Sequence, residues 1–260
     1  MGQRIVAVMA LAVSAGMWAQ SPADRSEFEV ASIKRNTSGD PSNRFMPSVG
    51  RLSVINMTLK DLLATAYQVR DFQISGVPGW IDSERYDIEA KADGKTGPKQ
   101  MAEPMLQALL QERFKLKVHR ETKELPIYVL TVAKSGLKIQ PAKEGSCVTP
   151  EPGKPAAPGQ RQSAFCGFHV IGRGRYDATY TTAPALATDL SVLLRRTVVD
   201  ETALTEAFDV HLRFAPEDAP DSNSPSIFTT VQEQLGLKFE SGKGPVEVLV
   251  IDQVEKPSEN

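Results

Sequence analysis

The sequence is poor in the residue types that form reaction centres. Its 260 residues include two cysteines and three histidines, and aromatic residues make up 7%. The histidines, His119, His169 and His211, stand too far apart to place two metal ligands on one helical turn. The sequence shows no Ser-His-Asp set, phosphate-binding glycine loop or nucleotide fingerprint. We therefore expect no cofactor.

An excess of one charge is also lacking. Thirty basic residues stand against 32 acidic ones, which gives a net charge of -2 and a pI near 6.0. Proteins that bind nucleic acid present a basic face, whereas Lys and Arg are scattered along this chain. We therefore expect neither nucleic acid nor an anionic membrane surface as a partner.

Long apolar runs are missing except at the start of the chain. Ile5 to Trp18 form an apolar run of about 15 residues, preceded by Arg4. Roughly 20 residues are needed to span a bilayer. With Ala19 just before Gln20, the layout is typical of a secretory signal peptide. We expect export to the periplasm or beyond, cleavage near Ala19/Gln20 and no stable membrane insertion afterwards. No cysteine stands at the cleavage point, which argues against a lipid anchor.

The two cysteines, Cys147 and Cys166, suit the oxidising compartment that export implies. A disulfide between them is the leading interpretation, and it would close a loop worth about 3 kcal/mol in the chain-entropy account. Two alternatives stay open. One is a pair of free thiols, and the other is a metal site formed with His169, for which a fourth ligand is missing.

The main pattern that is present occurs twice. Four short motifs of the first half return in the same order in the second half, at an offset of about 120 residues. The pairs are Gly50-Arg51-Leu52 with Gly174-Arg175-Tyr176, Tyr86-Asp87-Ile88 with Phe208-Asp209-Val210, Gln111 to Lys117 with Gln232 to Lys238, and Pro126 to Val132 with Pro245 to Ile251. We predict an internal duplication.

Each half combines strand-like and helix-like segments. In the first half, residues 28–34, 51–57 and 86–90 alternate as strands, and Thr58 is a good N-cap for a following helix. A second helix is predicted over 98–113, and residues 114–119 and 125–132 look like two arms of a hairpin. The second half repeats this, with hairpin arms at 237–240 and 246–254. The pattern predicts an α+β fold of two related halves, with mostly antiparallel strands and two helices each.

These features divide the chain into four parts. Residues 1–20 are the predicted signal peptide, and residues 21–140 are the first α+β repeat. Residues 141–163 are rich in proline and glycine and are predicted to be a linker. Residues 164–260 are the second repeat.

Three residues are candidates for a binding surface. Trp80 is a bulky aromatic in a turn-rich segment, where it either anchors a ligand or covers the first core. Asp87 and Asp209 occupy matching positions on the outer face of two strands. Such carboxylates suit acid-base work, although an outer strand face is usually only solvated.

Fragments of a serine-enzyme signature are also present. Ser135 and Lys138 have the Ser-x-x-Lys spacing, and Lys95-Thr96-Gly97 is the second fragment. Their order is reversed relative to penicillin-binding enzymes, and Ser135 follows a strand rather than opening a helix. We therefore predict no catalytic residues.

Several short motifs together resemble one family. They are Phe28 to Lys34, Thr58 to Leu63, Gly76-x-Pro78-x-Trp80, Tyr86-Asp87-Ile88, Leu109 to Phe114, Val198-Val199-Asp200 and Val250-Ile251-Asp252. This set is similar to soil-associated exported proteins of acidobacteria, a family of unknown function. The family usually has glycines after its Val-Asp pair, whereas residues 202–206 here contain none. More remotely, the first helix and its flanking strands resemble the short N-terminal domain of secretins and TonB-dependent receptors.

The resemblance implies no established activity. Some relatives are associated with membrane-embedded sensor peptidases, which implies an extracytoplasmic sensing or binding role. Our first hypothesis is thus a non-catalytic binding module that meets an unknown protein or envelope ligand at the junction of its halves or at a hairpin edge. The alternatives are an envelope hydrolase that uses Asp87, Asp209 or Ser135, and a structural surface protein.

Overall fold

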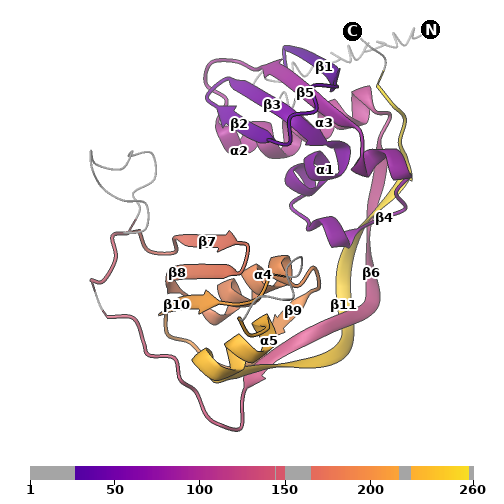
Figure 1. The fold of residues 1–260 in the computed structure, drawn as a ribbon. Coiled ribbons are helices and arrows are strands. Elements are labelled where there is room, and N and C mark those ends of the chain that lie inside the picture. Colours follow the sequence, from indigo (N-terminus) through magenta and orange to yellow (C-terminus); the bar gives the residue numbers. More distant parts are fainter. Residues whose placement is uncertain (1–26, 144, 150–164, 217–223, 258–260) are drawn as a thin grey trace, which may run out of the picture.

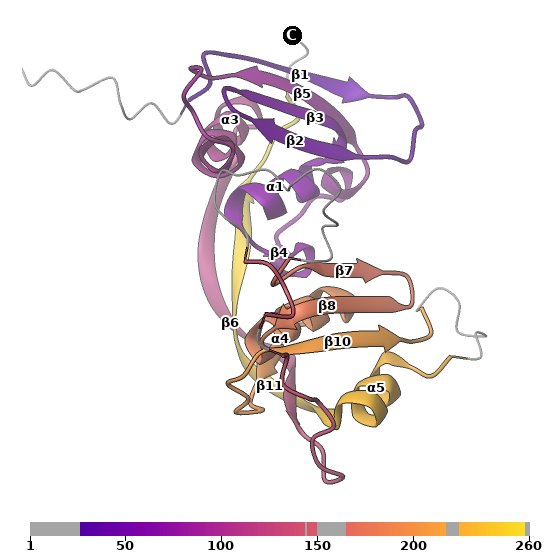
Figure 2. The same ribbon diagram turned by 90° about the vertical axis from the view of Figure 1, so that its left-hand side faces the viewer.

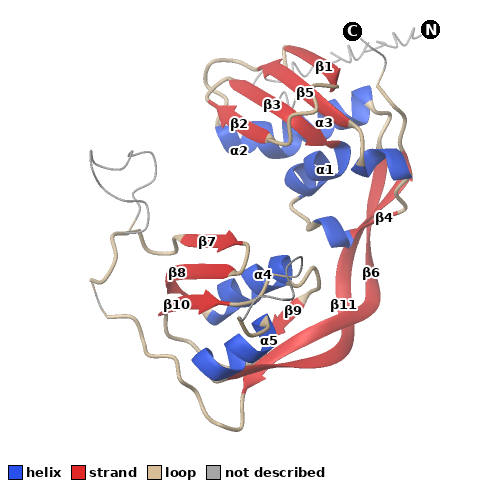
Figure 3. Cartoon of the chain, viewed as in Figure 1, coloured by secondary structure: helices blue, strands red, loops and turns tan. Residues whose placement is uncertain are grey.

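The computed structural model describes residues 27–143, 145–149, 165–216 and 224–257. Figure 1 shows two lobes joined along one side by a pair of long strands, β6 (Lys117–Val132) and β11 (Leu237–Gln253), which we call the ribbon. Both lobes contain helices and strands (Figure 3), which confirms the predicted α+β class. The predicted signal peptide lies outside the described residues.

The first lobe is built on a four-stranded antiparallel sheet in the order β1-β5-β3-β2. Its strands are β1 (Val30–Asn36), β2 (Arg44–Ser48), β3 (Arg51–Thr58) and β5 (Arg85–Lys91). The helical segments of this lobe are α1 (Leu59–Tyr67), η2 (Asp71–Gln73), η3 (Gly79–Asp82), α2 (Pro98–Gln100), the π-helical turn η4 (Met101–Met105) and α3 (Leu106–Arg113).

Local chemistry explains the helices of this lobe. The Thr58 side chain accepts a hydrogen bond from the Asp61 backbone, and the Asp61 side chain accepts one from the Thr58 backbone, which forms a capping box. The helix predicted over 98–113 is present as α2, η4 and α3 in succession. Pro104 lies inside η4 and has no N–H to donate, which accounts for the widened turn there.

The second lobe contains a three-stranded antiparallel sheet in the order β10-β8-β7. Figure 2 shows these strands one below another, as it does β1, β5, β3 and β2 of the first lobe. The elements are β7 (His169–Gly172), β8 (Arg175–Thr181), α4 (Ala183–Leu193), β9 (Val198–Asp200), β10 (Phe208–Arg213), α5 (Ile227–Thr230) and the π-helical turn η6 (Val231–Leu235).

The hairpin predictions are wrong. Residues predicted as two arms form one strand in each half, and β6 pairs with β11 from Lys117–Gln253 to Val132–Leu237. In the first half, residues 120–124 contain no Gly, Pro or Asn to make a turn. In the second half, Gly242, Gly244 and Pro245 are typical turn residues, yet they stay extended because β6 pairs alongside them.

The ribbon carries residues from each half into the core of the other. Leu249 and Ile251, near the end of the chain, belong to the first hydrophobic core with α1 and α3. Leu130 from β6 belongs to the second core. The short strand β4 (Ile74–Ser75) pairs in parallel with β11, and β9 pairs in parallel with β6. Each lobe is therefore completed by a strand whose continuation lies in the other lobe.

Left-handed backbone positions recur in the two lobes. Asn56 and Tyr180, with φ of 58° and 54°, each interrupt the register of a central strand. Lys115 and Gly236, with φ of 51° and 68°, each lie just before a ribbon strand. These correspondences accord with the predicted duplication, which remains a prediction, as does the four-part division of the chain.

Neither β2 nor β9 was predicted. The strand β2 contains Pro47, a residue that argues against a central strand but is tolerated on an edge. The strand β9 is only three residues long. The disulfide between Cys147 and Cys166 is present, which confirms the leading interpretation of the two cysteines. None of the helices in the described ranges is long and apolar enough to cross a membrane.

Gly236, the residue directly before β11, lies at a position that favours glycine. A Cβ atom there would lie 2.1 Å from the carbonyl oxygen of Gly136, whereas Gly39, with a similar φ of 73°, has open space around it. We expect Gly39→Ala to lower the free energy of unfolding by about 1 kcal/mol through backbone strain alone. Gly236→Ala should cost roughly 3 kcal/mol, since backbone atoms must move as well. Urea denaturation measures both, and equal costs would contradict the close packing seen here.

Candidate binding site

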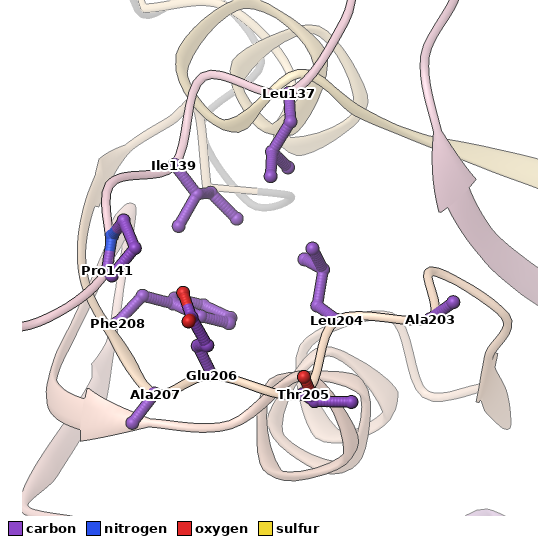
Figure 4. Close-up of a pocket in the computed structure, with 9 residues that line it drawn as sticks. All are labelled: Leu137, Ile139, Pro141, Ala203, Leu204, Thr205, Glu206, Ala207 and Phe208. Carbon is purple, nitrogen blue, oxygen red and sulfur yellow. The ribbon is translucent and has the colours of Figure 1, made fainter.

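A small hollow opens at the start of β10 in the second lobe (Figure 4). Its volume is about 170 Å³. One wall is the segment after β6, and the other is the loop before β10. The lining residues are Leu137, Ile139 and Pro141 on the first wall, and Ala203, Leu204, Thr205, Glu206, Ala207 and Phe208 on the second.

The first wall is held at both ends and stands away from β10 between them. At one end the Lys138 N–H donates to the Leu235 carbonyl at 3.0 Å. At the other end the Ala142 N–H donates to the Ala207 carbonyl at 2.8 Å. Next to this hydrogen bond, Pro141 and Phe208 form an isolated antiparallel β-bridge. In the first lobe, β1 pairs with β5 from Val30 to Asn36 at the corresponding edge. The hollow lies along the stretch where the second lobe lacks that continuous pairing.

The second wall is a turn that keeps a left-handed backbone without glycine. The Asp200 carboxylate accepts hydrogen bonds from the Thr202 N–H at 2.9 Å and from the Thr202 hydroxyl at 2.7 Å. The next residue, Ala203, has φ of 58°. A non-glycine residue in this region costs roughly 1–2 kcal/mol, and the Asp200 hydrogen bonds offset part of that cost. The missing family glycines therefore do not abolish the turn.

The size and lining of the hollow limit what it can bind. Pockets for whole small-molecule ligands usually measure roughly 300–1,000 Å³, and this hollow is smaller. It is large enough for one apolar side chain, since a cavity of about 150 Å³ lined by similar residues takes a benzene ring. Among the lining residues only Glu206 is charged. If a ligand carried a cation beside its bound apolar side chain, that cation could therefore pair with the Glu206 carboxylate in the wall.

The structure gives Asp87 and Asp209 the same local role, one in each lobe. The Asp87 carboxylate accepts hydrogen bonds from the Asn56 N–H and from the Asn36 side chain, each at 2.8 Å. The Asp209 carboxylate accepts one from the Tyr180 N–H at 2.8 Å. Both aspartates thus hold the left-handed residue of a bulged strand. The structure does not bring the two together, and their use as a binding surface remains a prediction.

Trp80 lies in η3 and packs against the first core. The Lys256 ammonium sits 5.7 Å from the centre of its ring. A cation over an aromatic face is a favourable contact, and it fastens the end of the chain to this lobe. This position fits the predicted role of Trp80 as a cover of the first core. Its alternative role as an anchor for a ligand remains a prediction.

A buried polar pair was not foreseen in the sequence. The Tyr176 hydroxyl donates to the Asp189 carboxylate at 2.9 Å, and His169 lies 3.6 Å from the same carboxylate. Burial, together with the Asp189 charge, raises the pKa of Tyr176. No metal-binding cluster occurs in the part of the chain that the structure describes. The sequence pointed to this pair only through Tyr176, which occupies the position that Leu52 has in the first half.

The serine-enzyme fragments lie in different lobes. Ser135 and Lys138 follow β6 in the second lobe, whereas Lys95-Thr96-Gly97 lies between β5 and α2 in the first. The Lys138 ammonium donates to the Glu233 carbonyl at 2.7 Å, and the Thr96 hydroxyl donates to Asp93. These residues are therefore not assembled into one site.

His211 belongs to a charged network on the outer face of β8 and β10. The Asp177 carboxylate pairs with Arg175, with His211 at 2.9 Å and with Arg213 at 3.1 Å. Partial burial raises the pKa of Asp177, but the hydrogen bonds from Arg175, His211 and Arg213 outweigh that effect and lower it from 3.8 to about 2.

This network predicts a pH dependence of stability. A carboxyl group with a lowered folded pKa stabilises the fold above its unfolded pKa, and the contribution is lost as the pH falls from about 4 to about 2. We expect Asp177→Asn to lower the free energy of unfolding by about 2 kcal/mol at pH 7 and to flatten its slope below pH 4. Glu121→Gln, in an exposed pair with Lys123, should change it by less than about 1 kcal/mol. Urea unfolding from pH 2 to pH 7 measures both, and an unchanged slope in Asp177→Asn would exclude this role.

Comparison with known proteins gives one match. No curated protein and no solved structure matches the chain. The prediction of a family of unknown function is confirmed, while the acidobacterial association and the likeness to secretins remain predictions. A family that matches residues 60–254, most of the chain, is described as a protein of unknown function (DUF3738), and the chain belongs to this family.

Proposed function

We propose that this protein is an exported, non-catalytic binding module that works outside the cytoplasm. In this proposal the hollow of the second lobe receives one apolar side chain from an extended segment of a partner protein. A Lys or Arg next to that side chain would pair with Glu206. The disulfide between Cys147 and Cys166 supports export, because such bonds persist in oxidising compartments.

The observation that carries the proposal is the hollow between the first wall and β10. It is lined mainly by apolar side chains, and Leu137 on its wall is 42% exposed. An exposed apolar side chain beside an apolar hollow favours binding of a partner, because burial of its surface is worth roughly 25 cal/mol per Å². The neighbouring strand edge adds backbone groups of the kind that bind extended peptides.

The hydrolase alternative has less support. The carboxylates of Asp87 and Asp209 accept hydrogen bonds from strand backbones, and Lys138 is engaged by the Glu233 carbonyl. A general acid or base needs to reach a substrate proton directly or through one water. The two aspartates suggested for hydrolysis thus hold the fold, and the lysine beside Ser135 in the Ser-x-x-Lys fragment is engaged elsewhere.

The test is a peptide-display selection on the purified chain beginning at residue 21. We expect selected peptides to carry Leu, Met or Phe beside Lys or Arg, and to bind with micromolar affinity. Leu137→Glu should weaken binding by roughly 100-fold, since it places a charge in the apolar hollow. Isothermal titration calorimetry measures the affinities.

Val132→Glu is the matched control. Val132 is 37% exposed, close to the exposure of Leu137, and it is absent from the lining of the hollow. This variant should keep the wild-type affinity. Equal loss in both variants, or peptides that bind Leu137→Glu as well as the wild type, would refute the proposed site.

A further inference from the structure

The first lobe has a hollow of different chemistry at the corresponding place. In the second lobe the hollow lies between residues 205–207, which precede β10, and the segment 137–141 beside that strand. In the first lobe a hollow lies between residues 83–85, at the start of β5, and residues 35–41, where β1 ends. Glu84 and Glu206 occupy matching positions in the two walls. We propose that this first-lobe hollow is a second binding site, for a ligand that carries a carboxylate.

The volume favours a whole small group rather than a single side chain. The first-lobe hollow measures about 410 Å³, which falls within the range of roughly 300–1,000 Å³ for ligand pockets. Most of its lining residues have polar or charged side chains. The lining residues are Arg35, Asn36, Thr37, Gly39, Asp40, Pro41, Asn56, Ser83, Glu84 and Arg85.

Several acceptors in this hollow are already engaged. The Glu84 carboxylate accepts hydrogen bonds from Lys256 at 2.5 Å and from the Tyr86 hydroxyl at 3.0 Å, and Arg35 lies 3.4 Å away. These partners lower the pKa of Glu84, with the Lys256 hydrogen bond as the largest cause. One Asp40 oxygen accepts two hydrogen bonds from Ser42, at 2.8 and 2.5 Å.

The donors, by contrast, have capacity left. A guanidinium group carries five N–H donors. Arg85 uses one nitrogen in a hydrogen bond to the Asn56 carbonyl at 2.9 Å, and Arg35 has the 3.4 Å contact with Glu84. The unused groups that line the hollow therefore include several guanidinium N–H groups. Such groups bind oxyanions, and a guanidinium matches the two oxygens of a carboxylate.

The charges of the lining residues balance, since Arg35 and Arg85 stand against Asp40 and Glu84. Outside the lining, Lys256 pairs with Glu84, and Asp87 accepts hydrogen bonds from Asn36 and Asn56. A monocarboxylate brings less excess negative charge to this balanced site than a phosphate dianion, so the local charge favours the monocarboxylate.

The back wall of the hollow is fixed before any ligand arrives. Asn56 is 2% exposed, and its side-chain amide donates to the carbonyls of Asp40 and of Ser42, the latter at 2.9 Å. The Asn56 backbone is held in turn by Asp87. Loop 37–42 is thus tied to the central strand, which reduces the ordering cost of binding.

The test is an NMR titration of the ¹⁵N-labelled chain with sodium acetate and with acetyl-Ala-Ala, whose free carboxylate represents the end of a peptide. We expect saturable shifts of amides in 36–41 and 83–85, with dissociation constants in the millimolar range. If both probes bind, the site takes carboxylates generally, and tighter binding of acetyl-Ala-Ala would identify peptide ends as its targets. Acetyl-Ala-Ala amide, inorganic phosphate and glucose should bind at least about tenfold more weakly.

Arg35→Gln and Arg85→Gln should each weaken acetate binding roughly tenfold, while Arg44→Gln, outside the hollow, should not. Arg85 donates a hydrogen bond to the Asn56 carbonyl, so Arg85→Gln could disturb the bulge at Asn56. Arg35→Gln removes an exposed side chain and remains informative in that case. Failure of acetate to bind, or equal binding in Arg35→Gln and the wild type, would overturn the proposal. Leu137→Glu should leave acetate binding unchanged, so the two sites are tested independently.

Discussion

The continuous pairing of β6 with β11 is the interaction on which the rest of this structure depends. Each strand starts in one lobe and ends in the other, so each hydrophobic core contains side chains supplied from the opposite half of the sequence. Leu249 and Ile251 fill the first core, although the chain reaches them only after the second lobe has been made. Contacts so distant in sequence are slow to form, because the loop between them must close first. Neither core is therefore built from one contiguous half of the sequence.

The ribbon also positions both hollows. In the second lobe, β6 ends at Val132, and the Ala133 N–H donates to the Gly236 carbonyl where β11 begins. This contact directs the chain past Gly136 to Pro141 and leaves a gap beside β10. In the first lobe, the end of β11 leads to Lys256, which neutralises Glu84 and covers Trp80. The chemistry of each hollow therefore depends on where a ribbon strand ends, and the two ends carry different residues.

Local patterns predicted the elements well, and long-range pairing accounts for what they missed. The Thr58 cap and the alternation in β5 are local signals, and each was found where expected. The hairpins failed because the alternation in 114–119 and 125–132 fits either two arms or one long strand, and only the partner strand decides. Asp87 and Asp209 were noticed as a matched pair, but their role needs the bulges at Asn56 and Tyr180, which no periodicity reveals. The hollow beside Leu137 depends on a pairing that does not form, so the sequence alone could not place it.

Removal of the end of the ribbon tests its role most directly. A chain that stops at Lys243 keeps every strand of the first sheet and the part of β11 that pairs with 126–132. Hydrogen exchange followed by mass spectrometry reports protection in both lobes. The account predicts that α1 and α3 lose protection, since Leu249 and Ile251 are gone from their core, while β8 and α4 in the second lobe stay protected. A chain that stops at Val254 should resemble the full-length protein. If α1 and α3 keep full protection in the shorter chain, the first lobe folds without its distant strand and the account is wrong.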